Sequence, residues 1–137
     1  MKDGPRALSL FERACADKDD WACGRLADLY LDGKGITHDP GKGAGLLLRS
    51  CDAKDGWACM RLGLLHSEGR GVPRDEKLAV QFSEKACTLG SAPGCNNLGT
   101  YYDGGVGVPR DKARARSLFK QACDGGSEQG CLNLKTP

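Results

Sequence analysis

The cysteines of this chain recur at a fixed spacing that leaves few folds open to it. Two cysteines eight positions apart occur four times, at 15 and 23, 51 and 59, 87 and 95, and 123 and 131, so each pair begins 36 residues after the one before. A constant period of this size is typical of stacked repeat proteins, in which each unit packs on its neighbours. The spacing predicts four such units, each with one cysteine pair.

Each unit begins with a pattern typical of a helix. Asp3, Asp39, Asp75 and Asp111 share one column of the repeat, just before the helical pattern, where a carboxylate can accept the first free backbone N–H groups. Four further columns hold small or apolar residues with helical spacing, so we expect them to form a buried stripe. These columns are Ala7/Gly43/Ala79/Ala115, Leu10/Leu46/Phe82/Leu118, Phe11/Leu47/Ser83/Phe119 and Ala14/Ser50/Ala86/Ala122.

A second helix follows a short turn in each unit. Gly90 and Gly126 are expected to cap the first helix in units three and four. The second helix is expected to start after Asp19, Asp55, Ser91 and Ser127 and to end at Gly33, Gly69 and Gly105. The pattern predicts an all-α, right-handed solenoid in one domain over residues 1–137. Its helix–turn–helix units are 3–38, 39–74, 75–110 and a shortened 111–137.

The cysteines are expected to form disulfides inside the units. The first cysteine of a pair ends one helix, and the second lies in the first turn of the next, so their Cα atoms can approach to the roughly 4.4–6.8 Å that a disulfide needs. Equivalent cysteines of adjacent units should be about 10 Å apart, which is too far. The predicted bridges are Cys15–Cys23, Cys51–Cys59, Cys87–Cys95 and Cys123–Cys131.

A metal site suits these cysteines less well than disulfides do. The chain has no C-x-x-C motif, and only His38 and His66 could complete a ligand set. We therefore expect no metal and no cofactor. Closing a nine-residue loop should stabilise the fold by roughly 2–3 kcal/mol per bridge.

Charge and cysteine content bear on partners and compartment. The 20 basic and 18 acidic residues give a net charge of +2, which is too balanced to predict nucleic-acid binding, and no apolar run is long enough to insert into a membrane. Eight cysteines in 137 residues favour an oxidising compartment. The first residues lack the apolar segment of a signal peptide. We expect a secreted or periplasmic protein whose export signal has been removed.

Several motifs resemble the Sel1-like repeat family. They are A-C-M-R-L-G at Ala58–Gly63, G-R-G-V-P-R-D at Gly69–Asp75, N-L-G-T-Y-Y at Asn97–Tyr102 and G-V-G-V-P-R-D at Gly105–Asp111. The chain looks most similar to the cysteine-rich, disulfide-bridged secreted branch known from Helicobacter. The resemblance implies an adaptor that binds other proteins. For the cysteine-rich branch it also implies penicillin binding and slow β-lactam hydrolysis.

The residues give little support to hydrolysis. Ser117 and Lys120 form an S-x-x-K match, so they are the weak catalytic candidates. The S-D-N element is absent, and Lys135–Pro137 lacks the glycine of K-T-G. A serine and a lysine on a helix surface are the simpler interpretation. An enzyme, if this is one, would be a β-lactam hydrolase.

A basic face on the first helices is the more suggestive pattern. Two columns carry cations, and a polar column on the second helices includes Asn97 together with Arg25, Arg61 and Asn133. We hypothesise a concave groove that binds a protein or peptide ligand with a carboxylate, or a β-lactam. The alternative is a solvated face balanced by acids such as Glu12 and Glu84. The cations are Arg6, Lys42 and Arg114 in one column and Arg13, Arg49 and Lys85 in the other.

Three large side chains are expected to serve packing. His66 occupies a column in which Tyr30 and Tyr102 stand, so a packed or capped role is favoured over catalysis. Trp21 and Trp57 open the second helices of units one and two, and packing in the core or between units is favoured over stacking on a ligand.

Overall fold

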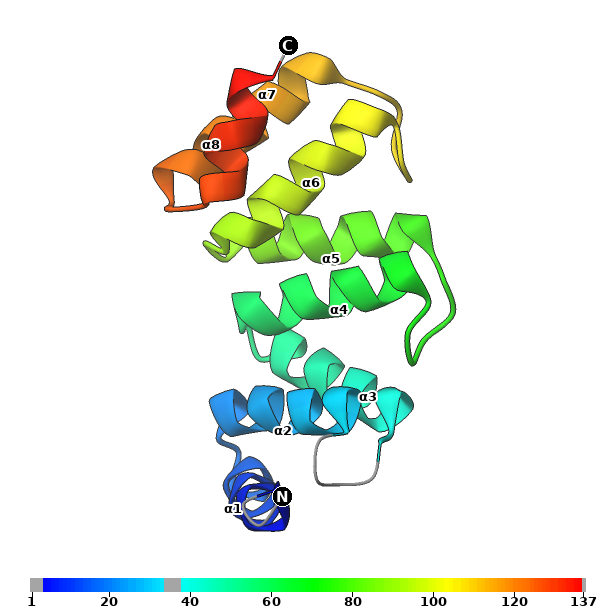
Figure 1. Cartoon of the computed structure of the whole chain (residues 1–137), viewed down its shortest axis with the longest axis vertical. Helices are drawn as coiled ribbons and strands as arrows, with labels where there is room; N and C mark the ends of the chain where they lie inside the picture. Colours follow the sequence, from blue (N-terminus) through cyan, green and yellow to red (C-terminus); the bar gives the residue numbers. More distant parts are fainter. Residues whose placement is uncertain (1–3, 34–37, 137) are drawn as a thin grey trace.

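The computed structural model describes residues 4–33 and 38–136, and in these ranges the chain is an α-solenoid of eight helices without a strand. The helices stack along the long axis of the molecule, so the two chain ends lie at opposite ends of the stack (Figure 1). The last helix is short, as the sequence predicts. The helices are α1 Gly4–Ala16, α2 Asp20–Asp32, α3 Pro40–Asp52, α4 Gly56–Glu68, α5 Glu76–Thr88, α6 Ala92–Gly104, α7 Lys112–Asp124 and α8 Glu128–Lys135.

The predicted N-caps are confirmed wherever the structure describes them. The carboxylates of Asp39, Asp75 and Asp111 each accept a hydrogen bond of 3.0–3.1 Å from the backbone N–H three residues later. Asp3 lies outside the described residues. Asp19, Asp55, Ser91 and Ser127 cap the second helices in the same way. Each helix start is therefore fixed by a local hydrogen bond that the sequence encodes.

The turns after α5 and α7 differ by one residue from the prediction. The capping positions are Leu89 and Gly125, and the glycines expected there follow them, Gly90 with φ +92° and Gly126 with φ +100°. In units one and two the same column holds lysine, and Lys18 and Lys54 adopt φ +68° and +71°. Those two lysines sit in the left-handed region, where a Cβ atom costs energy.

The buried stripe is confirmed for α3, α5 and α7, with an exception in α1. Leu47, Ala79 and Ala122 are each fully buried, whereas Leu10, predicted to be in the stripe, is 59% exposed. Its counterpart Leu46 packs against core clusters on both sides. No described helix precedes α1, so Leu10 lacks the neighbour that would cover it.

Glycine allows close approach where a second helix meets the first helix of the next unit. A Cβ atom on Gly43 of α3 would lie 2.9 Å from the Ala27 carbonyl oxygen of α2. In the next pair the small residue changes sides: a Cβ on Gly63 of α4 would lie 3.2 Å from the Ala79 carbonyl oxygen of α5. Each contact thus pairs one glycine with one alanine across the two helices.

The four predicted disulfides are confirmed, and each joins the two helices of one unit. The Cα atoms of the bridged cysteines are 4.5–4.6 Å apart. Cys51 and Cys59, in the middle of the stack, are completely buried, whereas Cys123 and Cys131 near its C-terminal end are half-buried. The first three bridges are therefore part of the core, and the fourth lies at its edge.

A backbone hydrogen bond joins the two ends of each loop between units. The backbone N–H groups of Asp39, Asp75 and Asp111 donate 2.9 Å hydrogen bonds to the carbonyls of Tyr30, His66 and Tyr102. Gly71 adopts φ +77°, and a Cβ there would come within 2.4 Å of the Pro40 carbonyl oxygen, so only glycine fits. This loop consequently lies against the start of α3.

Candidate binding grooves

All six cations of the two predicted basic columns have exposed side chains. They come from the first helices of the units. Because residues 36 positions apart face the same way in a regular stack, the members of each column lie on one face. Arg6 and Arg13 make no ion pair or hydrogen bond with any described residue. The other four contact neighbouring side chains or backbone. The members are Arg6 and Arg13 of α1, Lys42 and Arg49 of α3, Lys85 of α5 and Arg114 of α7.

Two of these cations lie over tyrosine rings. The Lys42 ammonium is 4.7 Å from the centroid of the Tyr30 ring, and the Arg114 guanidinium carbon is 5.7 Å from that of Tyr102. Interaction with Tyr30 raises the pKa of Lys42 above its ordinary value, and Glu12 and Asp39 add smaller contributions in the same direction. A cation above an aromatic face is attracted by the ring quadrupole, so both contacts stabilise the junction between two units.

Two further cations link neighbouring units. Arg49 of α3 donates a 3.4 Å hydrogen bond to the carbonyl of Cys15 at the end of α1. Lys85 of α5 lies 3.8 Å from a carboxylate oxygen of Asp52 on α3, with both side chains largely exposed. Exposed pairs of this kind contribute little to stability. A ligand could therefore compete for Lys85 more easily than for the hydrogen-bonded Arg49.

A pocket of about 370 Å³ opens between α3 and α5, with α4 beneath it; we call this the central groove. Its lining is almost entirely apolar. The His66 ring, 8% exposed, lies flat on Phe82 with centroids 5.6 Å apart and an interplanar angle of 8°. This confirms the packed role expected for the histidine. The principal lining residues are Gly41, Gly45, Leu48, His66, Leu78 and Phe82.

The equivalent space one unit further along is smaller and polar; we call it the C-terminal groove. A pocket of about 120 Å³ lies there between α5 and α7. Glu84, Arg114 and Ser117 are among its lining residues. The two grooves share four lining columns of the repeat but differ in size and polarity. These columns are Leu48/Glu84, Leu62/Leu98, Leu78/Arg114 and Phe82/Leu118.

The two catalytic candidates are not brought together. Ser117 is exposed and lines the C-terminal groove, whereas the Lys120 ammonium is 3.0 Å from Asp124 on the same helix. No hydrogen bond joins Ser117 to Lys120 or to any other described group. A nucleophilic serine needs an adjacent base, and the described residues do not supply one.

The polar column of the second helices is occupied by interactions between units. Arg61 reaches Asp28 at 3.3 Å, and Asn133 donates a 2.8 Å hydrogen bond to Asn96. Asn97, the proposed ligand contact, is half-buried and makes no side-chain hydrogen bond to a described residue. By the criterion of side-chain contacts, Asn97 is the member of this column that remains available to a ligand.

The tryptophans differ in burial. Trp57 packs partly into the core and against Gly24, as expected for a residue between units. Trp21 is 58% exposed, which corrects the prediction that it packs in the core or between units. Near the N-terminal end it contacts Phe11 edge to face, with centroids 5.9 Å apart. Arg25 lies between the two indoles, 5.4 Å from Trp21 and 4.7 Å from Trp57.

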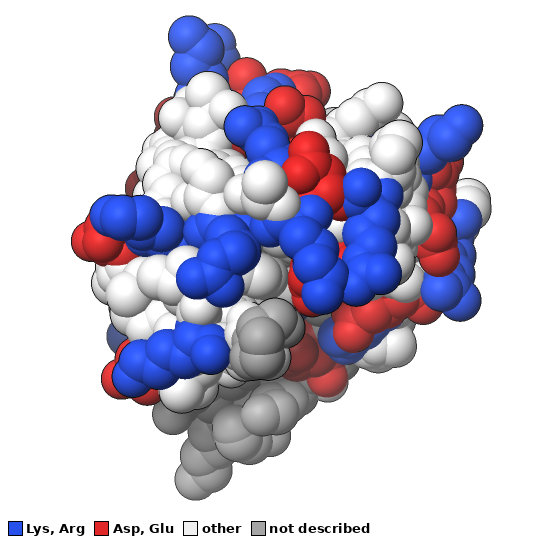
Figure 2. All heavy atoms as spheres, turned by 90° about the horizontal axis from the view of Figure 1, so that it is seen from above, with Lys and Arg blue, Asp and Glu red and all other residues white. Residues whose placement is uncertain are grey.

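The C-terminal end of the stack is basic. Helix α7 carries four exposed cations, Lys112, Arg114, Arg116 and Lys120, against one acid, Asp124. Lys and Arg side chains cross the middle of the face seen from this end (Figure 2). Asp and Glu side chains lie among them, so the excess of positive charge belongs to α7.

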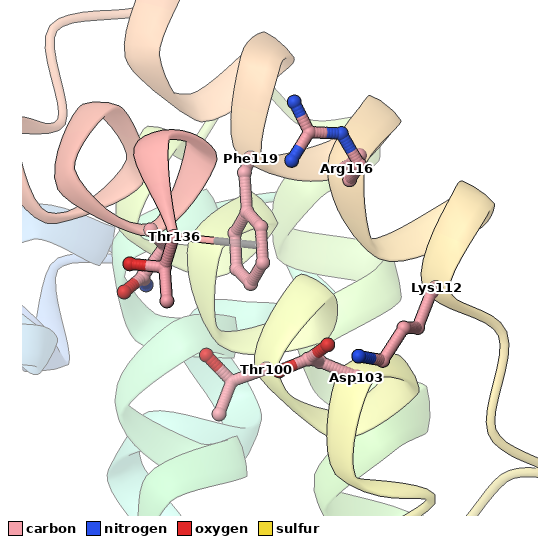
Figure 3. Close-up of a pocket in the computed structure, with 7 residues that line it drawn as sticks. Thr100, Asp103, Lys112, Arg116, Phe119 and Thr136 are labelled. Atoms are coloured by element: carbon pink, nitrogen blue, oxygen red, sulfur yellow. The ribbon is translucent and has the colours of Figure 1, made fainter.

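A pocket of about 140 Å³ opens at the same end, among α6, α7 and α8. The Phe119 ring points into it, and the Lys112 side chain extends toward Asp103 (Figure 3). Helix α8 has 8 residues where α6 has 13, so the pocket lies beside the end of the shorter helix.

Within residues 4–33 and 38–136, no three His, Cys, Asp or Glu side chains lie close enough together to hold a metal ion. Among the described helices, none has both the length and the apolar character that a membrane crossing requires.

The sequence prediction missed the residues that make the central groove apolar. Gly45, Leu48 and Leu78 each depart from their columns, which hold polar residues in the other units. Leu78, for instance, stands where Arg6, Lys42 and Arg114 stand elsewhere. Comparing exposed columns, rather than buried ones, would have identified this departure.

Comparison with known families gives a match over most of the chain. The model of the Sel1 repeat matches residues 1–19, 22–55, 58–91 and 92–127. The spans 22–55 and 58–91 each combine the second helix of one unit with the first helix of the next. No curated protein matches the chain.

Solved structures show the same architecture. A Sel1 repeat protein from Oxalobacter formigenes is 25% identical over 97% of this chain, with a TM-score of 0.90. The protective antigen c5321 of uropathogenic Escherichia coli, described as having an SLR fold, is 28% identical over 93%, with a TM-score of 0.86. The chain spans only 54% and 27% of these two proteins. Helicobacter pylori cysteine rich protein B is 30% identical, with 97% of this chain and 96% of that one aligned and a TM-score of 0.77.

Proposed function

Because the chain belongs to the Sel1 repeat family, we propose that it is a disulfide-stabilised scaffold that binds a protein or peptide ligand. The binding surface in this proposal is the face formed by α1, α3, α5 and α7. The observation that carries it is the pair of grooves at equivalent places along that face, the central groove of about 370 Å³ and the C-terminal groove of about 120 Å³. Successive grooves along a repeat array suit an extended ligand.

The exposed cations favour a ligand that carries carboxylates. Arg6 and Arg13 are unpaired among the described residues, and Lys85 is held only by an exposed ion pair. A guanidinium can bind a carboxylate through two parallel hydrogen bonds. In this proposal the ligand contacts are Arg6, Arg13, Lys42, Arg49, Lys85, Arg114 and Asn97.

The disulfides support an extracytoplasmic location. All eight cysteines are paired, and such bridges persist in oxidising compartments. We therefore place the protein and its ligand outside the cytoplasm.

The test is selection of peptide ligands from a random display library on the fully oxidised protein, followed by affinity measurement. Arg6→Glu/Arg13→Glu should weaken binding of the selected acidic peptides by at least about tenfold. Lys135→Glu, the same charge change on α8, serves as the control and should leave affinity unchanged. Failure to select any peptide, or equal affinity for the double variant, would contradict the proposal.

β-Lactam binding with slow hydrolysis is the second candidate. The observation in its favour is that the Ser117 hydroxyl lies in the C-terminal groove beside Arg114, a cation that could hold a carboxylate. Turnover of a chromogenic cephalosporin that co-elutes with the oxidised protein and disappears in Ser117→Ala would establish it. Absence of turnover above a host-protein blank would leave the binding scaffold.

A further inference from the structure

The central groove departs from the rest of the repeat in a concerted way. In its wall, Leu78 replaces the cation found in the other units, and His66 replaces the tyrosine beneath it. On the opposite wall, Gly45 and Leu48 stand where α5 has Gln81 and Glu84. The side chains that fill the equivalent space in other units, or that place a charge in it, are therefore absent from the central groove.

The groove also has room that the protein itself leaves empty. A Cβ atom added to Gly45 would meet no described atom within 4 Å. Leu48, which lines the same wall, is 44% exposed, so apolar surface faces the opening. A pocket of about 370 Å³ lies within the range typical of sites that take a small molecule or a large side chain.

One polar group in the lining defines the chemistry of the occupant. The Nδ1 atom of His66 lies 3.2 Å from the carbonyl oxygen of Pro73. A carbonyl only accepts, so Nδ1 must carry the proton, and Nε2 is left as an acceptor. Nε2 has no hydrogen-bond partner among the described residues, and His66 as a whole residue is 8% exposed. A molecule that occupies the central groove should therefore bring a hydrogen-bond donor.

We infer that the central groove is an anchor pocket for one aromatic side chain with a hydrogen-bond donor, an indole or a phenol, on a peptide segment of the partner. The apolar body of the ring would lie against Leu48, Leu78 and Phe82, and its N–H or O–H would donate to Nε2 of His66. Tryptophan and tyrosine combine such a body with such a donor, and they dominate the energetics of many interfaces. This inference rests on the proposed peptide-binding function and specifies what the ligand must contain.

The inference can be tested without the partner. N-acetyltryptophanamide is titrated into the ¹⁵N-labelled, oxidised full chain, and backbone amide resonances are followed. The amides of Gly41 and Gly45 should shift, with a dissociation constant on the order of 1 mM. The analogue methylated at the indole nitrogen, which lacks the donor, should bind about tenfold more weakly, and so should N-acetylphenylalaninamide.

Variants drawn from the other units provide the controls. Gly45→Gln copies the residue of α5, should fill the pocket and should abolish the shifts. Gly45→Ser, which copies α1 and α7, is a smaller change and should retain part of the binding. Ala16→Gln, at the exposed end of α1, should bind as the unaltered protein does. An unchanged mass under non-reducing conditions and an unchanged circular dichroism spectrum confirm that each variant folds.

Two results would overturn the inference: no shift at Gly41 and Gly45, or equal affinity for the methylated and unmethylated indoles. Selected peptides that bind without a common tryptophan or tyrosine would also overturn it while leaving the proposed scaffold intact. Failure of peptide selection combined with specific indole binding would instead remove the scaffold proposal and leave a small-molecule pocket.

Discussion

The central groove and the C-terminal groove are built by the same repeat, yet they differ in chemistry. In the first, Leu78 lies near His66 and Phe82 in an apolar pocket. In the second, Arg114 lies over Tyr102, and Glu84 and Ser117 also line the space. The buried columns are similar in both places. Exposed columns can therefore change without disturbing the fold, and the units differ most in chemistry at the grooves.

The same contrast extends to the core. The Cys51–Cys59 bridge beneath the middle of the stack is fully buried, whereas Cys123 and Cys131 are only half covered. All four bridges close loops of the same length, so their chain-entropy contributions are equal. Any difference in the stability that the four bridges contribute must therefore come from the packing around them. The middle and the end of the stack should therefore respond differently to the same kind of substitution.

The largest effect is expected from removing a bridge. Cys51→Ala/Cys59→Ala should lower the free energy of unfolding by about 3–5 kcal/mol, because buried contacts are lost together with the cross-link. Cys123→Ala/Cys131→Ala should cost about 2–3 kcal/mol. Urea denaturation of both variants measures the difference. Equal costs would mean that burial of the bridge adds nothing.

The next effect comes from converting the central groove into the C-terminal type. Leu78→Arg alone should cost about 1 kcal/mol, because a cation replaces a half-buried apolar side chain. Adding His66→Tyr supplies a ring beneath the cation, so the pair should show a favourable coupling of about 0.5–1 kcal/mol. A double-mutant cycle by chemical denaturation measures it. Additive costs would show that the cation–tyrosine contact does not set the chemistry of a junction.

A smaller effect is expected at the turn that joins the helices of a unit. Lys54→Gly should stabilise the protein by roughly 0.5–1 kcal/mol, since relief of the left-handed conformation outweighs the added freedom of the unfolded chain. Gly90→Lys, the reverse change in the next unit, should destabilise by a similar amount. Thermal unfolding of both variants decides the sign. A loss of stability in Lys54→Gly would indicate that the lysine side chain contributes more than its backbone costs.

The smallest effect concerns the titration of Lys42. Tyr30→Phe should lower the pKa of Lys42 toward its ordinary value of 10.5, because the tyrosine is the main cause of the rise. A raised lysine pKa favours the folded state below 10.5, and this contribution is lost as the pH rises through the higher folded-state value. NMR titration of the Lys42 side chain measures the shift, with Tyr102→Phe as the control. An unchanged pKa in Tyr30→Phe would show that Glu12 and Asp39 suffice.

The parts of the fold that depend on local sequence could be predicted. The caps at Asp39 and Asp55 and the bridge Cys51–Cys59 involve residues close in the chain, so the repeat pattern determines them directly. Leu10 and Trp21 were predicted wrongly because their burial depends on a neighbour that a regular array supplies only in its interior. Periodicity describes a unit with neighbours on both sides, and among the described residues α1 has a neighbouring helix on one side only.

The grooves could be predicted only in part. The cations of the basic columns lie on an exposed face, as expected, but the contact between Arg49 and the Cys15 carbonyl depends on the distance between α1 and α3. Likewise, the space above Gly45 results from side chains of three helices, and no single column encodes it. The sequence contained the relevant departures at Leu48 and Leu78. Their meaning required the neighbouring helices.

The short span of each disulfide has a consequence for how the protein matures. Eight cysteines can pair in 105 ways, but each native partner is only eight positions away along the chain. Contact within a loop of about that length forms in roughly 10–100 ns, far faster than contact between distant thiols. The native thiols of a unit can therefore meet as soon as both have been added to the growing chain. Oxidation can proceed one unit at a time, before the later cysteines are present to compete.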